Sequence, residues 1–445
     1  MSRKVNRRRF LGQSAAVATG FWLGASSTSR ASRSANEKLN VAFIAAGGRA
    51  KANIKAISAL GENVVAFCDV DDKRAAETYN ANPNTPRFRD FRKMLEAVKG
   101  IDAVVVSTAD HAHAVASIAA MRQGKHVYCE KPLTHSVYEA RLMRETAEKG
   151  KLATQMGNVG TGYSGFRRGV EVIQSGAIGP VHTVHVWTDR PGKYWKQGLD
   201  TPTAQEAVPA TLDWDLWLGP AAEQPYHKAF VPHDWRGWFD FGCGSLGDMG
   251  CHTANLPFMG LKLGAPSTVV AETSERKPDC FPAWAIITYE FPARGELPPV
   301  KLIWYDGGKK PSADLMPGTK ELAKSGCLLI GAKGMLFSPD DYGVTHRLLP
   351  EDQFADFKAP MPSLPRGTGP DALWNYKEWT NACKTASKTL SNFDYASRLT
   401  EVALLGNLAV RTGKKITWDA VAMKAIGCPE ADPFVKPEFR KGWEL

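Results

Sequence analysis

Three side chains of this 445-residue sequence have the types and spacing for proton transfer, namely Lys131, Asp248 and His252. Asp248 and His252 are four residues apart, so a helix would place both on one face. A histidine can take a proton from a hydroxyl group while hydride leaves the same carbon, and a carboxylate can orient the imidazole or hold a neighbouring hydroxyl. A lysine ammonium can donate or relay a proton. On spacing alone, a salt bridge for Lys131 and a helix-stabilising pair for the other two explain these residues better than catalysis does.

The elements that would position these side chains begin with an alternating pattern between residues 39 and 156. Short apolar runs alternate there with segments of helical spacing, which predicts a parallel, doubly wound sheet. Ligands of such sheets bind at the carboxyl ends of the strands. Those ends are expected to carry Gly47, Asp69, Thr108 and Lys131. The predicted strands are 39–45, 63–70, 102–107, 126–129 and 152–156, and the predicted helices are 50–60, 91–98, 113–123 and 138–149.

The first strand-to-helix turn, residues 45–50 (Ala-Ala-Gly-Gly-Arg-Ala), partly matches the dinucleotide fingerprint G-x-G-x-x-G/A. Gly47 takes the second glycine position, where bare backbone lets a pyrophosphate approach a helix N-terminus, and Ala50 is an accepted third residue. Ala45 departs from the first glycine, which normally permits the tight turn. Asp69 lies about twenty residues on, where an acid accepts hydrogen bonds from the adenosine ribose and repels a 2′-phosphate. The pattern predicts NAD in preference to NADP; a helix-capping role for Asp69 is the alternative.

After about residue 160 the pattern changes. Segments 181–189, 283–291 and 300–305 alternate like half-exposed strands, and helices are expected at 373–385 and 395–412. This predicts a C-terminal α/β domain with a large, mainly antiparallel open sheet, one face of which can pack on helices or on another subunit of a homo-oligomer. The predicted organisation is a signal peptide at 1–34, a dinucleotide-binding domain at 38–157, and a substrate and oligomerisation domain at 158–445, whose terminal helices can pack back on the first domain.

Several segments, in their order along the chain, resemble the Gfo/Idh/MocA family of sugar oxidoreductases. The family signatures T-P-x-x-x-H and G-K-H-V-x-x-E-K-P are similar to residues 108–113 (Thr-Ala-Asp-His-Ala-His) and 124–132 (Gly-Lys-His-Val-Tyr-Cys-Glu-Lys-Pro). Segments 235–240, 244–252 and 440–443 are similar as well. Together they extend the resemblance over nearly the whole chain after the signal segment.

The resemblance implies an N-terminal Rossmann domain, NAD(P)-dependent oxidoreduction at CH–OH groups, and catalytic roles for Lys131, Asp248 and His252, with the lysine positioning or polarising the substrate oxygen. The predicted cofactor contacts are Gly47, Gly48, Arg49, Asp69, Thr108, His113, Glu130 and Asn158. The predicted substrate contacts are Tyr163, Trp235 and Arg236. Aromatic faces suit the C–H-rich faces of sugars, although core or interface packing is the alternative for any one tryptophan. A structural capping role is the alternative for His113.

The N-terminal segment carries most of the positive charge. Of the formal net charge of +10, seven positive charges and no acid lie in residues 1–36, so +3 remains for the rest, which argues against a nucleic-acid partner. Residues 6–11 (Asn-Arg-Arg-Arg-Phe-Leu) resemble a twin-arginine signal, and the weakly apolar stretch after them is too short to span a bilayer stably. We expect export to the periplasm by the export machinery; an amphipathic helix on a membrane surface is the alternative.

The eight cysteines form no C-x-x-C pair, and most are expected to be small buried hydrophobic residues. Zinc bound by His252 with His111, His113 or His233 is a minor alternative, because the His-x-His pair lacks the i, i+4 spacing of helical zinc sites. We predict no metal.

The resulting functional prediction is NAD-dependent hydride transfer to or from a hydroxyl-bearing carbon of a sugar, polyol or glycoside. Free NAD is scarce outside the cytoplasm, so one alternative is a glycosidase that oxidises a sugar transiently, eliminates the aglycone and re-reduces the sugar. The other alternative is a catalytically silent sugar-binding protein on the same fold, motivated by Ala45 in the glycine turn.

Overall fold

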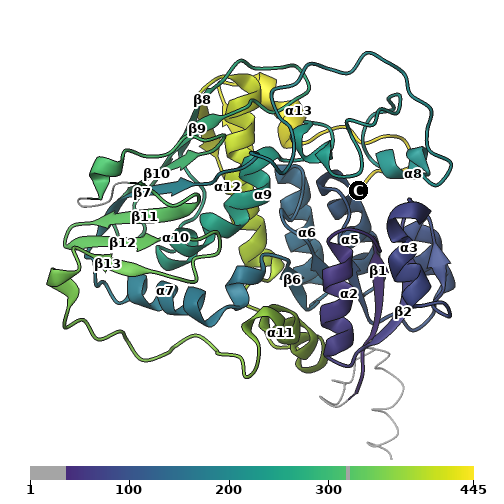
Figure 1. Cartoon of the computed structure of the whole chain (residues 1–445), viewed down its shortest axis with the longest axis horizontal. Coiled ribbons are helices and arrows are strands. Elements are labelled where there is room, and N and C mark those ends of the chain that lie inside the picture. Colours follow the sequence, from purple (N-terminus) through teal and green to yellow (C-terminus); the bar gives the residue numbers. More distant parts are fainter. Residues whose placement is uncertain (1–36, 317–320) are drawn as a thin grey trace, which may run out of the picture.

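The computed structural model describes residues 37–316 and 321–445 (Figure 1). The predicted signal peptide, residues 1–34, lies outside the described residues. Two sheets make up the described chain, one of six strands and one of nine. This arrangement confirms the predicted α/β class with a parallel sheet followed by a mainly antiparallel one.

All neighbouring strands of the first sheet are parallel, in the order β3-β2-β1-β4-β5-β6. Its central strand β4 is an unbroken buried run of Ala and Val, as expected where helices cover both faces. The strands are β1 (Asn40–Ile44), β2 (Asn63–Cys68), β3 (Arg87–Phe88), β4 (Ala103–Val106), β5 (His126–Cys129) and β6 (Thr154–Met156). The helices are α2 (Ala50–Ala59), α3 (Asp72–Ala81), α4 (Phe91–Ala97), α5 (His113–Arg122) and α6 (Val137–Lys149).

Helix α3 and the short strand β3 were not predicted. The sequence of α3, DKRAAETYNA, has few large apolar side chains, so its hydrophobic pattern is weak. Its start is fixed by capping instead, because the Asp71 carboxylate accepts hydrogen bonds from the backbone N–H groups of Lys73 and Arg74.

The second sheet has the order β13-β12-β11-β7-β10-β9-β8-β14-β15, and only β7 and β10 pair in parallel. Burial alternates along β9, which fits a strand with one face on the core. The strands are β7 (Val181–Trp187), β8 (Thr268–Thr273), β9 (Ala285–Phe291), β10 (Val300–Tyr305), β11 (Gly326–Gly331), β12 (Gly334–Ser338), β13 (Arg347–Leu349), β14 (Ile416–Asp419) and β15 (Lys424–Ile426).

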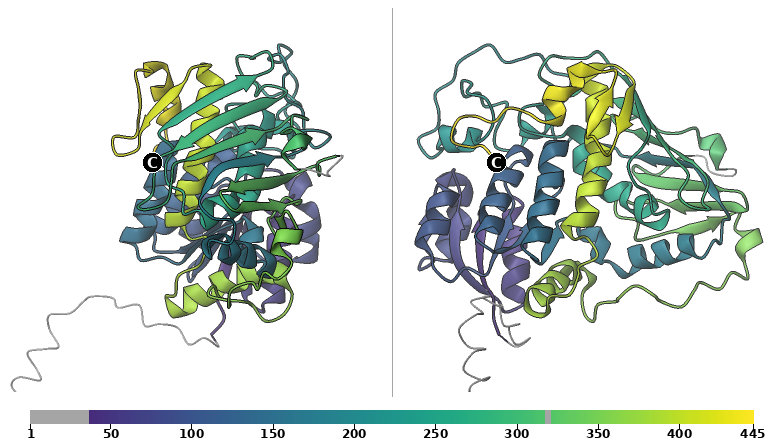
Figure 2. Two further views of the ribbon diagram at one scale, coloured as in Figure 1. Left: turned by 90° about the vertical axis from the view of Figure 1, so that its left-hand side faces the viewer. Right: turned by 180° about the vertical axis from the view of Figure 1, so that it is seen from behind.

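Two late helices pack against the first sheet, and one of them also packs against the second. Helix α12 (Phe393–Thr412) runs between the two sheets in Figure 1 and is buried along most of its length. Helix α11 (Asp371–Thr385) lies at the lower edge of the first sheet, and the view from behind in Figure 2 shows the same placement. Trp379 of α11 is fully buried and shares a core cluster with Val41, Phe43 and Tyr128 of the first sheet.

The remaining helices, α7 (Ser164–Gln174), α8 (Trp214–Leu218), α9 (Gly244–Thr253), α10 (Asn255–Gly260) and α13 (Asp432–Val435), belong to the second half of the chain. In the described ranges no helix is long and apolar enough to cross a membrane. Over those same residues, no group of three or more His, Cys, Asp or Glu side chains is arranged to hold a metal ion. All eight cysteines are free thiols.

Candidate active site

A crevice of about 450 Å³ opens at the carboxyl ends of β1, β2, β4 and β5. Its walls come from the glycine turn, from the ends of these strands and from the second half of the chain, which contributes Trp217, Trp235 and Arg236. The C-terminal segment closes one side through Trp443, whose ring packs on Phe91 with the ring centroids 5.9 Å apart. Predicted residues that line the crevice are Gly47, Gly48, Arg49, Asp69, Thr108, Glu130, Lys131, Trp235 and Arg236.

The glycine turn at the base of the crevice has two residues in the left-handed region, Ala45 (φ 81°) and Gly48 (φ 57°). Ala45 therefore adopts the conformation that a glycine at this position normally supplies. A side chain on Gly47 would meet Arg74, with its Cβ 2.6 Å from the Arg74 carbonyl oxygen. Close packing of α3 on the turn thus requires Gly47, a requirement independent of the predicted approach of a pyrophosphate.

Asp69 is buried directly beneath this turn. Its Oδ2 accepts hydrogen bonds from the backbone N–H groups of Ala46 (2.8 Å) and Gly47 (3.0 Å), and its Oδ1 accepts one from Asp71 (3.0 Å). Burial raises the pKa of Asp69, while these hydrogen bonds and the charge of Arg74 oppose the rise. Asp69 therefore ties the end of β2 to the glycine turn, and its contact with a ribose stays a prediction.

A second polar group lies where α2 meets the end of β5. Arg49 Nε donates to Glu130 Oε1 at 2.9 Å, and Asn53 donates to the same oxygen at 3.0 Å. The Arg49 guanidinium also donates to the Tyr376 hydroxyl of α11 at 3.1 Å. Burial alone would raise the pKa of Glu130, but Arg49 and Lys131 outweigh it and the net shift is downward. The carboxylate is thus held ionised next to Lys131.

Lys131 and Arg236, which line the crevice, both meet Asp248, which like His252 is not among the lining residues. Lys131 Nζ donates to Asp248 Oδ1 at 2.5 Å and to the Asp248 carbonyl oxygen at 3.2 Å. Arg236 Nε lies 3.0 Å from the same Oδ1, close enough for an ion pair but without hydrogen-bond geometry. Burial alone would raise the pKa of Asp248, yet Lys131 and Arg236 together hold it well below its usual range. The site therefore contains one carboxylate shared between two cations.

His252 completes this group from the last turn of α9, one helical turn after Asp248. The side chain is 7% exposed, and its Nδ1 has no hydrogen-bond partner in the described chain. Burial lowers the pKa of His252 well below its ordinary value, and the nearby charge of Lys131 lowers it further. The ring of Tyr342 packs edge-on against it, with centroids 5.0 Å apart. At neutral pH His252 is therefore an uncharged imidazole with a free ring nitrogen.

Two predicted cofactor residues do not line the crevice. The His113 ring is 1% exposed, with Nδ1 2.8 Å from the Pro132 carbonyl oxygen and Nε2 3.2 Å from that of Thr108. Asn158 is fully buried, accepts a hydrogen bond from Ser391 and donates to the Cys251 carbonyl oxygen. Both side chains connect segments behind the site instead of facing it.

On the substrate side, the predicted residues Tyr163, Trp235 and Arg236 have different surroundings. The Arg236 guanidinium lies over the Trp235 ring, 4.3 Å from its centroid. Tyr163 packs edge-on against Tyr342, with centroids 6.2 Å apart. Tyr342 therefore joins Tyr163 to His252 as an aromatic wall.

Sequence reasoning missed Arg74 and Tyr342, and considered His233 only as a zinc ligand. Arg74 and His233 line the crevice, and the Arg74 guanidinium covers Gly48. The Asp71 cap was the available signal for Arg74, because it indicates a helix that returns along the glycine turn. No local pattern marks Tyr342, which lies in a loop where the Asp340 carboxylate accepts hydrogen bonds from the N–H groups of Tyr342 and Val344.

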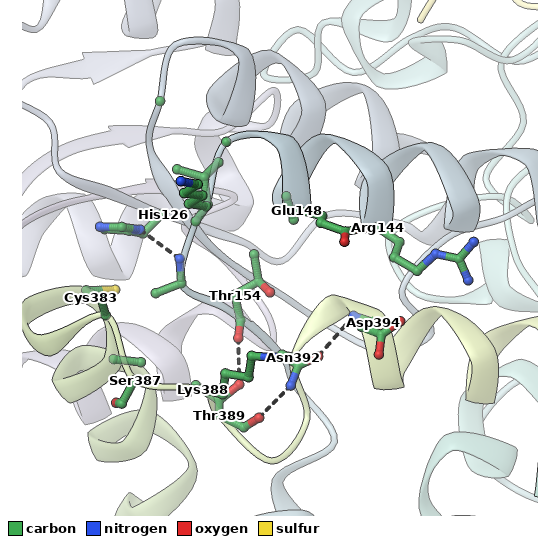
Figure 3. A pocket seen from close by; sticks show the side chains of 18 of the residues that line it. His126, Arg144, Glu148, Thr154, Cys383, Ser387, Lys388, Thr389, Asn392 and Asp394 are labelled. Carbon is green, nitrogen blue, oxygen red and sulfur yellow. Dashed lines mark hydrogen bonds between the residues drawn. The ribbon is translucent and has the colours of Figure 1, made fainter. Parts of the chain in front are cut away.

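A larger cavity of about 1760 Å³ lies at the amino ends of the strands of the first sheet, where β5 and β6 begin. Figure 3 shows its rim, formed by α6 with Arg144 and Glu148 and by the segment from Cys383 to Asp394. Charged side chains of both signs line it, and none of the predicted site residues does. The chemistry suggested above therefore belongs to the smaller crevice.

Comparison with known proteins gives two family matches. The model of the Gfo/Idh/MocA oxidoreductases, described as an oxidoreductase family with an NAD-binding Rossmann fold, matches residues 39–158. The model of the C-terminal alpha/beta domain of the same oxidoreductase family matches residues 167–309.

Individual curated relatives match shorter parts of the chain, at about 30% identity. Inositol 2-dehydrogenase 3 of Saccharopolyspora erythraea is 31% identical over 160 residues, which are 35% of this chain and 46% of the relative. Glucose-6-phosphate 3-dehydrogenase of Bacillus subtilis is 29% identical over 118 residues, 26% of this chain and 33% of the relative. The chain thus spans less than half the length of these curated relatives.

Solved structures share the fold over most of the chain. The WlbA dehydrogenase of Bordetella pertussis, in complex with NADH and UDP-GlcNAcA, has a TM-score of 0.60 at 15% identity and covers 86% of this chain and 99% of its own. An inositol dehydrogenase homologue of Azotobacter vinelandii, complexed with NADH and myo-inositol, has a TM-score of 0.57 at 16% identity. The match covers 86% of this chain and 98% of the homologue.

Proposed function

Because this chain belongs to the Gfo/Idh/MocA oxidoreductase family, we propose that it transfers a hydride between NAD and a hydroxyl-bearing carbon of a sugar, polyol or glycoside. One observation carries the proposal: Lys131, Asp248 and His252, which come from separate parts of the sequence, form one buried group beside a crevice with a glycine turn.

The residues of the crevice fit a dinucleotide. The backbone N–H groups of Gly48 and Arg49, at the start of α2, donate to no other group of the described protein, and the Arg49 side chain does not cap the helix. Free N–H groups at a helix N-terminus bind phosphate oxygens. Gly48 and Arg49 would therefore hold the pyrophosphate, with Asp69 below the turn and Thr108 at the next strand end. NAD supplies hydride acceptance and donation when bound.

The protein's own residues would then handle the proton. In the oxidative direction the substrate C–H bond breaks with its electron pair as hydride, and the hydroxyl proton passes to the neutral imidazole of His252, leaving a carbonyl group. Lys131 donates a hydrogen bond to the substrate oxygen in addition to its bond to Asp248. Asp248 orients that ammonium and stabilises the imidazolium that forms.

The proposal is tested by following NADH absorbance with a panel of sugars, polyols and glycosides. We expect His252→Asn and Lys131→Met to lower kcat by about 10²- to 10⁴-fold, the usual contribution of a general acid or base. His182→Asn, an exposed histidine of β7, is the matched control. Wild-type rates in His252→Asn would exclude the assigned base.

Two measurements separate the alternative functions from this one. Aglycone release without NADH accumulation would identify a glycosidase that oxidises and re-reduces its substrate. Absence of bound nucleotide in the purified protein, together with no stabilisation by added NAD, would identify a sugar-binding protein.

We also propose that residues 1–34 direct export to the periplasm and that the chain forms a homo-oligomer. The basic segment supports the first proposal, and the exposed apolar residues Val270 and Ile426 of the second sheet support the second. Replacing Arg7, Arg8 and Arg9 with lysine should retain the protein in the cytoplasm. Light scattering should give a mass above that of one 48.6 kDa chain.

A further inference from the structure

His113 lies behind the site, between the loop of Thr108, the segment of Lys131 and the start of α9. It is the first residue of α5 and follows the loop that carries Thr108. Its ring contacts the carbonyl oxygen of Pro132, the residue after Lys131. Its neighbour Asp110 is 1% exposed, and the Asp110 Oδ2 accepts a hydrogen bond from the backbone N–H of Cys243, the residue preceding α9. Through these bonds the short segment 108–113 is joined to the residue after Lys131 and to the residue before the helix of Asp248 and His252.

The two ring nitrogens of His113 both face carbonyl oxygens, Pro132 at 2.8 Å and Thr108 at 3.2 Å. A carbonyl oxygen only accepts hydrogen bonds, so both bonds form only if both nitrogens carry protons. A neutral imidazole would leave one buried carbonyl facing a lone pair.

We propose that His113 is a buried imidazolium that positions Lys131, by donating one ring N–H to the Pro132 carbonyl and the other to the Thr108 carbonyl. It touches neither crevice nor substrate, so it is a positioning residue and not a catalytic one. Its effect on catalysis rests on the proposed function, whereas its protonation state does not.

The surrounding charges agree with this assignment. Burial alone would lower the pKa of His113, but the Cys129 sulfur, Asp110 and the Pro132 carbonyl outweigh it and raise the pKa to about 9. His113 also interacts with Glu139 of α6 and with His111. Arg236, Lys131 and Asp248 act on Asp110.

His111 has the same kind of hydrogen-bond partners, so the charges around the two rings, and not hydrogen bonding alone, separate them. Its ring nitrogens also lie near carbonyl oxygens, of Phe241 at 3.2 Å and of Trp217 at 3.0 Å. Burial lowers its pKa to about 4, and the charge on His113 opposes a second cation beside it. The Asp110 carboxylate raises the pKa of His113, so the proton stays on that ring.

The protonation state is measured on the full chain labelled with ¹⁵N at the histidine rings, by long-range ¹H–¹⁵N correlation from pH 6 to pH 8. The expected result is protons on both nitrogens of His113 across this range and on a single nitrogen of His111. His126, whose Nδ1 accepts the Ala153 N–H at 3.0 Å, gives the signature of a bare nitrogen in the same spectrum. The His113→Asn variant assigns the signals. A bare nitrogen on His113 at pH 7 would overturn the proposal, whether or not the protein has redox activity.

Kinetics test the positioning role. His113→Asn should lower kcat by about 10- to 100-fold, because a small misplacement of a reacting group has effects of this size, while the KM for NAD changes much less. The exposed His182→Asn is the control. An unchanged kcat in a folded His113→Asn protein would show that the imidazolium does not position Lys131.

Discussion

At the scale of single residues, the site depends on one buried carboxylate between two cations and one uncharged imidazole. Lys131 and Arg236 keep Asp248 ionised, and burial keeps His252 neutral. An uncharged imidazole beside cationic groups supplies the proton acceptor that hydride transfer with proton removal requires.

Ala45 provides a test of backbone strain in the glycine turn. An alanine at φ 81° is disfavoured by about 1 kcal/mol or more relative to glycine, partly offset by the greater freedom of glycine in the unfolded chain. Ala45→Gly should therefore raise the free energy of unfolding by up to about 1 kcal/mol, measured by urea denaturation. Ala46→Gly, one residue along, is the control and should lower it by about 0.5–1 kcal/mol. Destabilisation by Ala45→Gly would contradict the strain argument.

Buried histidines predict how stability depends on pH. Burial lowers the pKa of His111 to about 4 and of His135 to about 3, below the value of about 6.5 in an unfolded chain. The unfolded state therefore binds more protons below pH 6.5, so the stability is fully present above that pH and is lost as the pH falls towards the folded values. Each histidine contributes about 1.4 kcal/mol per pH unit in that window.

His135→Gln should accordingly reduce the loss of unfolding free energy between pH 6 and pH 5 by about 1.4 kcal/mol, measured by urea denaturation at each pH. The exposed His182→Gln is the control and should leave that slope as it is in the wild type. An unchanged slope in the His135 variant would mean that this ring binds protons alike in the folded and the unfolded protein.

At the scale of elements, α3 determines the shape of the cofactor crevice, although it contributes no predicted residue. Its cap Asp71 sets where the helix begins, and the packing of Arg74 on Gly47 and Gly48 follows from that start. Helix α9 has the corresponding role on the other side, because its register places Asp248 and His252 one turn apart.

Asp71→Ala tests the role of the α3 cap. Loss of the two cap hydrogen bonds should reduce the free energy of unfolding by about 1 kcal/mol and weaken NAD binding, because the Arg74 side chain loses its fixed position over the turn. Denaturation and a fluorescence titration with NAD measure the two effects. Asp72→Ala, within the first turn of the same helix, is the control. Unaltered stability in Asp71→Ala would show that packing alone fixes the helix.

At the scale of the whole molecule, we expect the two sheets to unfold as one unit, because α12 packs against both sheets and α11 is bonded to the first. Tyr376 of α11 donates to Asn53 of α2 at 2.7 Å, and Tyr128 of β5 donates to Asn375 of α11 at 2.9 Å, both within the core. The Arg49 contact to Tyr376 extends this connection to the candidate site.

Trp379→Ala tests this integration. Removing a fully buried tryptophan should cost about 3–5 kcal/mol, and fluorescence and circular dichroism should still follow one common unfolding transition. The exposed Asn381→Ala of the same helix should change stability by less than about 0.5 kcal/mol. Two separate transitions in the Trp379 variant would show that the sheets unfold independently.

The sequence by itself determined the parallel sheet and the catalytic candidates, because continuous apolar runs and strand-end positions are local signals. The βα alternation between residues 39 and 156 and the four-residue spacing of Asp248 and His252 both have direct structural consequences. Only the tertiary structure decided that His113 and Asn158 lie behind the crevice and that Arg74 and Tyr342 lie at the site. Such positions depend on which carbonyls and rings the packing brings within reach, and some of those partners are distant in the sequence, up to 233 residues from Asn158 to Ser391.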